Sequence, residues 1–122
     1  MKINENNKGF DAEKLAAIFL VSNGLKLVVQ NYHCRFGEID LIMKDASTLV
    51  FVEVRLRSNA KFGSAGASIT LQKQQKLIAA AQHYLQQHGQ SHGNPACRFD
   101  AILMNKADLQ HIEWVRNAFE TH

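Results

Sequence analysis

The chain has 122 residues, 46% of them hydrophobic, and a formal net charge of +3. This length and composition support one buried core but not two, so residues 1–122 are expected to form a single domain. No apolar run approaches the ~18 residues of a membrane-spanning helix, and residues 1–9 are polar and lack a signal-peptide core. The sequence therefore predicts a cytoplasmic protein with no membrane partner, whose small positive charge permits nucleic-acid binding without demanding it.

The first predicted element is a helix over about residues 10–22, because its apolar side chains recur at helical spacing. Asn23 and Gly24 end it in the manner of a C-cap, and residues 25–32 form the first predicted strand. Glu13 lies at the flank of the apolar stripe, where a side chain can reach the sheet edge. On the pattern alone, an exposed first-turn glutamate favoured by the helix dipole is the simpler interpretation. The stripe consists of Ala12, Leu15, Ala16, Phe19 and Leu20.

Two strand patterns, in residues 37–42 and 51–57, flank a segment rich in turn-forming residues at positions 45–48. They predict an antiparallel hairpin in which Lys44 lies opposite Leu49. Each strand carries carboxylates inside an apolar pattern, which is unfavourable unless another group compensates the charge. The register of the hairpin determines which group is close enough to do so.

When the register is continued from this turn, Asp40 lies opposite Glu53, and Glu38 lies opposite Arg55. Two full charges about 5 Å apart repel by roughly 3 kcal/mol at an effective dielectric near 20. This repulsion vanishes if one carboxyl is protonated, or becomes attraction if a divalent cation lies between Asp40 and Glu53, and oxygen ligands suit Mg²⁺ or Mn²⁺. The alternative is a structural ion pair of Glu38 with Arg55, but it leaves Asp40 opposed to Glu53 without an explanation.

The second half of the chain predicts one more helix and two more strands. Residues 58–67 are small and polar and are expected to form a mobile loop. Thr70 is a suitable N-cap for a helix over about residues 71–87, and strands are predicted at residues 99–104 and 109–115. The resulting order, α-β-β-β-α-β-β, predicts an α/β fold with a mixed β-sheet flanked by helices.

Several short motifs follow one another in order along nearly the whole chain. They are Gly9, Glu13 and Ala16, then Asn31, residues 37–42 and 51–57, Lys73, residues 98–100 and residues 117–119. With this ordered set the chain resembles the YraN family, small bacterial proteins of unestablished function that are similar to archaeal Holliday-junction resolvases. Its core of Asp40, a hairpin and Glu53-x-Arg55 resembles the PD-(D/E)XK nuclease superfamily. The resemblance implies a restriction-endonuclease-like fold.

The resemblance also implies a nuclease-like phosphodiesterase that depends on Mg²⁺ or Mn²⁺ and acts on nucleic acid, on DNA rather than RNA, with branched DNA among the candidate substrates. In that interpretation Asp40, Glu53 and Arg55 are catalytic, and Glu13, Asp40 and Glu53 hold the metal. Arg55 stands where most active nucleases carry lysine; because arginine stays protonated, it can stabilise phosphate charge but cannot act as a general base. The alternatives left open are a catalytically weak or inactive nucleic-acid-binding module of the same fold, and a structural adaptor.

Basic residues cluster near the acidic pair in the sequence. Arg57 continues the Glu53 face by alternation, Lys61 lies in the predicted loop, and Lys73 and Lys76 lie in the first turns of the second helix. Lysines at a helix N-terminus favour phosphate, so Arg57, Lys61 and Lys73 are the predicted nucleic-acid-binding residues. A solvated helix face is the alternative, above all for Lys76. The sequence is compatible with a homodimer and does not determine the oligomeric state.

Two further groups of residues invite a functional interpretation and have simpler ones. His88 and His92 have helical ligand spacing and Cys97 follows, but glycines interrupt the segment and structural zinc needs four ligands, so a zinc site is disfavoured. Asp100 is either an acid behind the metal ligands or a structural partner of Arg98. Predicted core residues are Phe99, Trp114 and Phe119, and predicted reduced thiols are Cys34 and Cys97.

Overall fold

The computed structural model describes residues 8–57, 69–105 and 108–120. Its elements are α1 (Lys8–Ser22), β1 (Lys26–Cys34), β2 (Gly37–Asp45), β3 (Thr48–Arg57), α2 (Leu71–His88), the short 3-10 helix η3 (Gly89–His92), β4 (Cys97–Asn105) and β5 (Asp108–Phe119). The predicted order of helices and strands is confirmed. None of the described helices is long and apolar enough to cross a membrane. The predicted loop at residues 58–67, with Lys61, lies outside the described residues.

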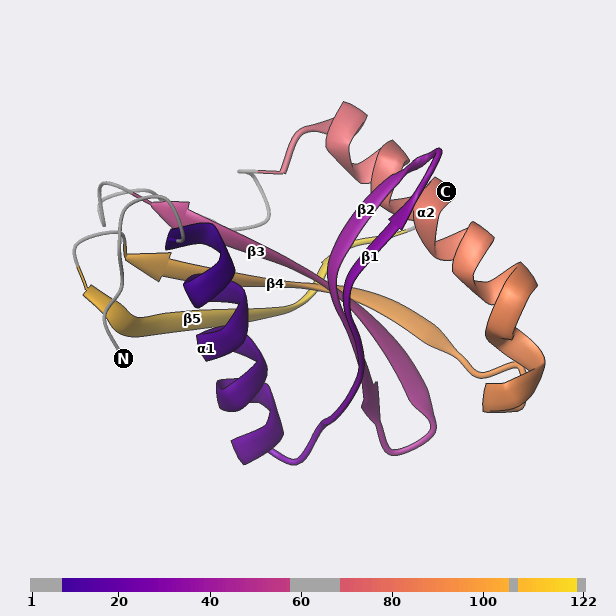
Figure 1. Cartoon of the computed structure of the whole chain (residues 1–122), viewed down its shortest axis with the longest axis horizontal. Coiled ribbons are helices and arrows are strands. Elements are labelled where there is room, and N and C mark those ends of the chain that lie inside the picture. The colour runs from indigo at the N-terminus through magenta and orange to yellow at the C-terminus, as the bar shows by residue number, and fades with distance from the viewer. Residues whose placement is uncertain (1–7, 58–68, 106–107, 121–122) are drawn as a thin grey trace.

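The five strands form one sheet in the order β1-β2-β3-β4-β5, as Figure 1 shows. Neighbouring strands are antiparallel except β3 and β4, which run parallel. Two parallel strands need a long crossover between them, and α2 lies in that crossover. Thr70 caps α2 as predicted, because its side-chain oxygen accepts a hydrogen bond from the backbone N–H of Lys73 at 3.1 Å.

The two helices pack against separate cores on the two sides of the sheet. Along β3 the side chains alternate between these cores, as a strand requires: Val50 and Val52 contact the α1 side, whereas Leu49 and Phe51 contact the α2 side. By the same alternation Glu53 belongs to the α2 side. The α1 core includes Ala12, Ala16, Leu20, Leu41, Met43, Ile102 and Met104. The α2 core includes Ile39, Ile42, Leu77, Ala81, Tyr84 and Phe99.

The hairpin of β2 and β3 has the predicted register, but its ladder is shorter than predicted. Lys44 pairs with Leu49, and the pairing continues as far as Leu41 with Val52. Beyond that point β3 remains paired with β4, whereas β2 remains paired with β1 alone. Figure 1 shows the result, a fork in which the β1–β2 hairpin leads toward α2 while β3 continues beside β4.

Because the ladder ends at Leu41, the expected pairing of Glu38 with Arg55 is wrong. Glu38 instead lies opposite His33 of β1 in the strand register, and His33 Nδ1 lies 3.1 Å from Glu38 Oε2, an ion pair when the imidazole is protonated. Arg55 lies opposite Leu103 of β4. The ion pair of Glu38 with Arg55, which was the alternative to a metal site, is therefore absent among the described residues, and Glu38 interacts with His33 instead.

A kink in the β1–β2 hairpin accounts for the fork. Asn31 has a φ of 57°, in the left-handed region that asparagine tolerates better than most residues. It lies in β1 between the pairs Gln30–Leu41 and Tyr32–Ile39. Across this step β2 turns over, since Leu41 packs in the α1 core and Ile39 packs in the α2 core. The hairpin beyond Asn31 therefore leans onto α2.

The tip of the leaning hairpin meets α2 at Gly37. Its φ is 150°, and a Cβ built at this position would lie 3.4 Å from the backbone oxygen of Lys76. The backbone conformation thus favours glycine, and an added Cβ would lie at the limit of van der Waals contact with the helix. The contact fixes the height of the hairpin tip above the first two turns of α2.

Candidate functional site

The fork between β2 and β3 brings Asp40 close to two other acids, Glu13 and Glu53. These three residues are called the acidic group. One oxygen of its carboxylate, Oδ2, accepts a hydrogen bond of 2.8 Å from the backbone N–H of Val54. That N–H points toward β2 where the ladder has already ended, so the side chain of Asp40 satisfies a donor that backbone pairing would otherwise satisfy. Asp40 is therefore held in the gap between the two strands.

Glu53 is the most deeply buried acid of this group, with 7% of its surface exposed. Its pKa is raised from 4.5 to about 8, first because burial penalises the charged form and second because the Asp40 carboxylate accepts a hydrogen bond from the protonated acid and repels the ionised one. Lys73 acts in the opposite direction, with its Nζ 3.5 Å from Glu53 Oε2. Near neutral pH the carboxyl group of Glu53 is largely protonated.

Glu13 enters the same group from α1. It is half-buried rather than exposed, which corrects the simpler interpretation of the sequence. Burial, followed by repulsion from Asp40 and Glu38, raises its pKa to about 7. Its Oε1 atom is buried, and no residue in the described ranges forms a hydrogen bond with it. An acid that is buried, repelled by two neighbours and only partly hydrogen-bonded is electrostatically strained.

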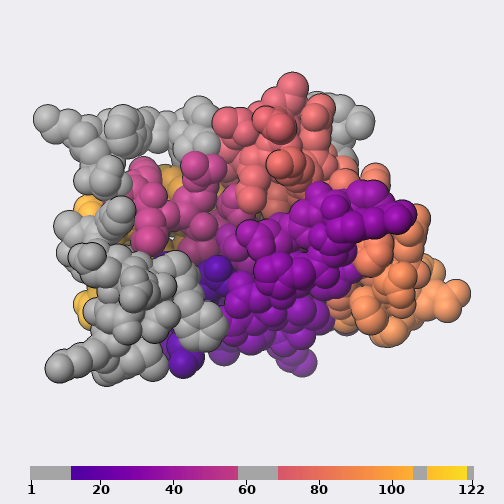
Figure 2. All heavy atoms as spheres, turned by 45° about the horizontal axis from the view of Figure 1, so that its top comes forward, coloured from indigo at the N-terminus to yellow at the C-terminus, as the bar shows by residue number. Residues whose placement is uncertain are grey.

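Asp40 therefore links acids from two layers of the molecule. Glu13 approaches it from the α1 side and Glu53 lies on the α2 side of β3, and both have pKa values raised by Asp40. Figure 2 shows the face on which α1 (indigo), the β1–β2 hairpin (purple) and β3 (magenta) adjoin. Three carboxylates from three elements form a donor set of hard oxygen atoms, the kind that Mg²⁺ and Mn²⁺ prefer.

The carboxylates of the acidic group do not surround a common point in the way that the ligands of a bound metal do. Within residues 8–57, 69–105 and 108–120, no three histidine, cysteine, aspartate or glutamate side chains are arranged as a ready metal-holding group. The ammonium group of Lys73 lies beside Glu53, where it offsets part of the charge. A divalent cation would bind by displacing protons from Glu53 and Glu13 and by pulling their oxygen atoms closer together.

The two arginines of β3 differ in their surroundings. Arg55 is half-buried and follows Glu53 by two residues on the same face of the strand. Arg57 is only 12% exposed in its side chain, and its Nη2 donates to Glu113 Oε1 at 3.2 Å. The charge of Arg57 is thus offset by β5, so this residue is less available to a phosphate than the sequence pattern indicated.

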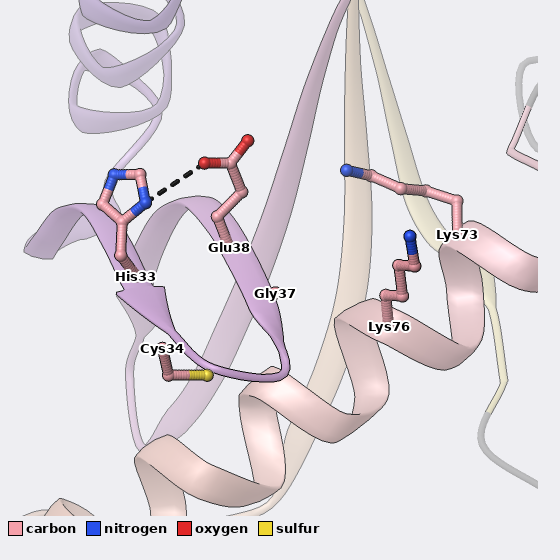
Figure 3. A pocket seen from close by; sticks show the side chains of 6 residues that line it. All are labelled: His33, Cys34, Gly37, Glu38, Lys73 and Lys76. Atoms are coloured by element: carbon pink, nitrogen blue, oxygen red, sulfur yellow. Dashed lines mark ion pairs between the residues drawn. The ribbon is translucent and has the colours of Figure 1, made fainter.

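A hollow of about 350 Å³ lies next to the acidic group, between the hairpin tip and α2. Figure 3 shows its six lining residues, with the amino group of Lys73 directed from α2 toward Glu38 and the side chain of Lys76 rising from the helix below it. The lining residues are His33, Cys34, Gly37, Glu38, Lys73 and Lys76. Sequence reasoning identified the lysines but missed His33 and Cys34, because only the kink at Asn31 brings their strand against α2.

Asp100 lies outside the acidic group and has a structural role. It is 1% exposed, and its carboxylate accepts hydrogen bonds from Arg98 Nε at 3.1 Å, Trp114 Nε1 at 3.0 Å and the backbone N–H of Asn117 at 3.1 Å. Asn117 has a φ of 51° and lies where the register between β4 and β5 shifts. Beyond this bulge β5 continues to Phe119, past its predicted end at residue 115. Arg98 also pairs with Asp45, at 3.0 Å. These contacts join β4, β5 and the turn after β2.

The histidines near the end of α2 take part in packing. His92 Nε2 and the hydroxyl of Tyr84 are hydrogen-bonded at 2.8 Å, and the ring centre of His88 lies 4.8 Å from that of Tyr84. Cys97 and Cys34 are free thiols. Phe99 is buried, and Trp114 and Phe119 are partly buried against the two cores, as predicted.

Comparison with known proteins gives one consistent result. The model of a family described as "Uncharacterised protein family UPF0102" matches residues 12–104. A UPF0102 protein of Methylobacillus flagellatus is 56% identical over 111 residues, which cover 91% of this chain and 95% of the relative. UPF0102 proteins of Nitrosospira multiformis and Nitrosomonas europaea are each 55% identical, over 94% and 93% of this chain and 94% of each relative. The chain therefore belongs to the UPF0102 family, the YraN family that its ordered motifs indicated.

Proposed function

We propose that this protein binds nucleic acid and hydrolyses a phosphodiester bond at the acidic group of Glu13, Asp40 and Glu53, with Mg²⁺ or Mn²⁺ as cofactor. The observation that carries the proposal is the gathering of these three carboxylates in the fork, at the expense of raised pKa values for Glu13 and Glu53. A cluster of repelling acids reduces the stability of the folded state. A cation-dependent function gives a physical reason for such a cluster.

Each residue has a distinct part in the proposed reaction. Val54 holds one Asp40 oxygen in place, so the position of that carboxylate does not depend on a cation. Lys73, next to Glu53, and Arg55, two residues further along β3, supply positive charge for a phosphate whose negative charge grows during hydrolysis. A bound divalent cation would polarise the phosphate and lower the pKa of a water molecule. Because Arg55 stays protonated, it stabilises charge and takes no proton.

A catalytically weak or inactive nucleic-acid-binding module is the second candidate function. Two observations favour it: the permanent charge of Arg55, and the direct pairing of Lys73 with Glu53 in a site whose acids do not form a metal-holding group among the described residues. In this case the basic side chains bind the phosphates of the nucleic acid, and repulsion from the acidic group keeps those phosphates at a distance from it. A structural adaptor without nucleic-acid binding is the third candidate.

The proposal extends to the setting of the reaction. We expect a cytoplasmic location and DNA rather than RNA as the partner, with branched DNA among the substrates, as the resemblance to resolvase-like PD-(D/E)XK nucleases implies. Contacts to the phosphate backbone carry little sequence information, so binding is expected to depend only weakly on sequence and to weaken steeply with salt. A homodimer remains compatible with this function.

A cleavage assay with Mg²⁺ and with Mn²⁺ on single-stranded, duplex and branched DNA tests the proposal. The parent protein should cleave at least one substrate, and Glu53→Gln should abolish cleavage while retaining or tightening binding, because the amide can never become the carboxylate that repels phosphate or holds a cation, and the lysines stay in place. Glu120→Gln is the matched control, since Glu120 is exposed beyond β5 beside Cys97 and Arg98. Binding without cleavage by the parent would favour the inactive module, and cleavage by Glu53→Gln would show that the acidic group is not catalytic.

A further inference from the structure

We infer that the hollow between the hairpin tip and α2 binds one unpaired nucleotide, with its phosphate at Lys73 and Lys76 and a neighbouring base stacked on Phe36. This inference rests on the proposed function and specifies it, since it makes nucleic acid with an unpaired segment the preferred substrate class. The hollow and the acidic group share a wall. Lys73 lines the hollow, and its Nζ lies 3.5 Å from Glu53 Oε2.

The hollow has the size and charge for a single nucleotide. Its volume of about 350 Å³ is at the lower end for small-ligand sites, which matches the size of one nucleotide. Two lysines project into it, and the opposing carboxylate of Glu38 is already paired with His33 at 3.1 Å, as Figure 3 shows. The floor is fixed, because Gly37 lies directly against the backbone of Lys76.

An exposed aromatic residue lies at the tip of the hairpin that forms one wall. Arg35 and Phe36 make the turn between β1 and β2, and 42% of the Phe36 surface is exposed. The guanidinium carbon of Arg35 lies 4.8 Å from the centre of the Phe36 ring. The ring of His83 lies 5.7 Å away on α2, and its Nδ1 is hydrogen-bonded to the hydroxyl of Tyr32 at 2.6 Å. The Arg35 guanidinium thus lies over the Phe36 ring and His83 lies beside it, while part of the ring remains exposed.

This combination matches what unpaired nucleic acid requires. A single exposed apolar residue is ordinary on protein surfaces, but Phe36 directly precedes Gly37, which lines a hollow with two lysines. Proteins that bind single strands combine basic grooves along the backbone with aromatic side chains on which bases stack. His83 lies seven residues after Lys76 on α2, a rise of about 10 Å. Adjacent nucleotides can therefore reach the lysines and Phe36 together.

Fluorescence anisotropy without divalent cations, at about 50 mM salt, tests the inference with three labelled probes. The probes are a single strand of about 12 nucleotides, a blunt duplex of the same length, and that duplex with a short single-stranded overhang. The parent should bind the single strand and the overhang more tightly than the blunt duplex. Phe36→Ala should weaken binding of the first two by about tenfold and leave the duplex unchanged, whereas Phe36→Trp should retain full affinity.

Two further variants separate stacking from charge and from general surface effects. Lys76→Gln should weaken all binding that uses the hollow and lower the slope of log affinity against log salt by about 1. Ile18→Ala, which removes another exposed apolar side chain from α1, should change nothing. Equal loss on all three probes with Phe36→Ala, no loss on any, or tighter binding of the blunt duplex by the parent would overturn the inference while leaving the proposed function intact. If the parent bound none of the probes, both would fail.

Discussion

The carboxylate of Asp40 accepts a hydrogen bond of 2.8 Å from the backbone N–H of Val54, although the two residues lie on strands that have already ceased to pair. A side chain here does what the backbone of a neighbouring strand does elsewhere in the sheet. The bond allows β2 to leave β3 without an unsatisfied donor, and it holds an acid next to Glu53. The same hydrogen bond thus stabilises the divergence of β2 from β3 and the position of Asp40 in the acidic group.

The stability of the protein is predicted to fall as pH rises from about 4.5 to about 8 and then to level off. The pKa of Glu53 is raised from 4.5 to about 8 in the folded state and that of Glu13 to about 7, so the folded state binds more protons than the unfolded state in this range. Glu53 has the larger shift and should therefore contribute most of the loss. Urea unfolding between pH 5 and pH 9 measures it.

Glu53→Gln provides the control for this pH dependence. A neutral amide cannot ionise, so the variant should lose much of the fall in stability and should be more stable than the parent at pH 9. A variant that retained the full pH dependence of the parent would show that Glu53 is not the titrating group.

Divalent cations are predicted to raise the melting temperature, and more so at pH 8 than at pH 6. A cation that binds only the folded state stabilises it by about 2.7 kcal/mol at a hundredfold excess over its dissociation constant. Protons on Glu53 and Glu13 compete with the cation, so the stabilisation should grow as these groups ionise. Thermal melts in Mn²⁺ and Mg²⁺ at the two pH values measure the effect.

Asp40→Asn tests where such a cation binds. It should remove most of the metal-dependent shift, because Asp40 is the acid that raises the pKa of both Glu13 and Glu53, whereas Glu120→Gln should shift as the parent does. An identical response of Asp40→Asn and the parent would place the cation elsewhere.

Gly37→Ala is predicted to destabilise the fold by about 1–3 kcal/mol. The residue has a φ of 150°, and the new Cβ would approach the Lys76 backbone oxygen to 3.4 Å. Gly24→Ala is the matched control, since Gly24 also has a positive φ, 98°, but a Cβ there would contact nothing within 4 Å. Thermal melts should show a larger loss for Gly37→Ala, and an equal loss would mean that the contact with α2 adds no constraint.

Asp100→Ala is predicted to destabilise the protein by about 3–5 kcal/mol, because it leaves Arg98 partly buried without one of its two carboxylate partners. The indole N–H of Trp114 and the backbone N–H of Asn117 lose their acceptor at the same time. Urea unfolding gives the loss. The metal-dependent shift in melting temperature should survive in this variant if it remains folded at low temperature, and loss of that shift would instead place Asp100 in the acidic site.

The sequence predicted those features that depend on local pattern. Turn-forming residues gave the register of the β2–β3 hairpin, and this register brought Asp40 near Glu53 because only a few residues separate the pair from the turn. The Thr70 cap and the α-β-β-β-α-β-β order also follow from local signals. The pairing of Glu38 with Arg55 failed because alternation assumes a straight ladder, and nothing local marks its end at Leu41.

The remaining features depend on contacts between distant segments. Asn31 in a strand pattern is an ordinary polar residue until its φ is known, and the hollow that contains His33 and Cys34 exists only because the hairpin leans onto α2. The neutralisation of Arg57 by Glu113 likewise joins residues 56 positions apart. A pattern of charges along one strand cannot show which strand will supply the counter-charge.

The fork also determines how far apart the carboxylates of Asp40 and Glu53 lie. Asp40 belongs to the arm formed by β1 and β2, and Glu53 belongs to the arm formed by β3, β4 and β5, with the Leu41–Val52 pair as the pivot between them. The spacing of the two carboxylates is thus set by the angle between the arms rather than by strand pairing. When Glu53 is protonated, its hydrogen bond to Asp40 and the bond from Val54 to Asp40 both link the arms, and ionisation of Glu53 replaces the first bond by repulsion. A cation bound between the two carboxylates would restore an attractive link between the arms at pH values where Glu53 is ionised.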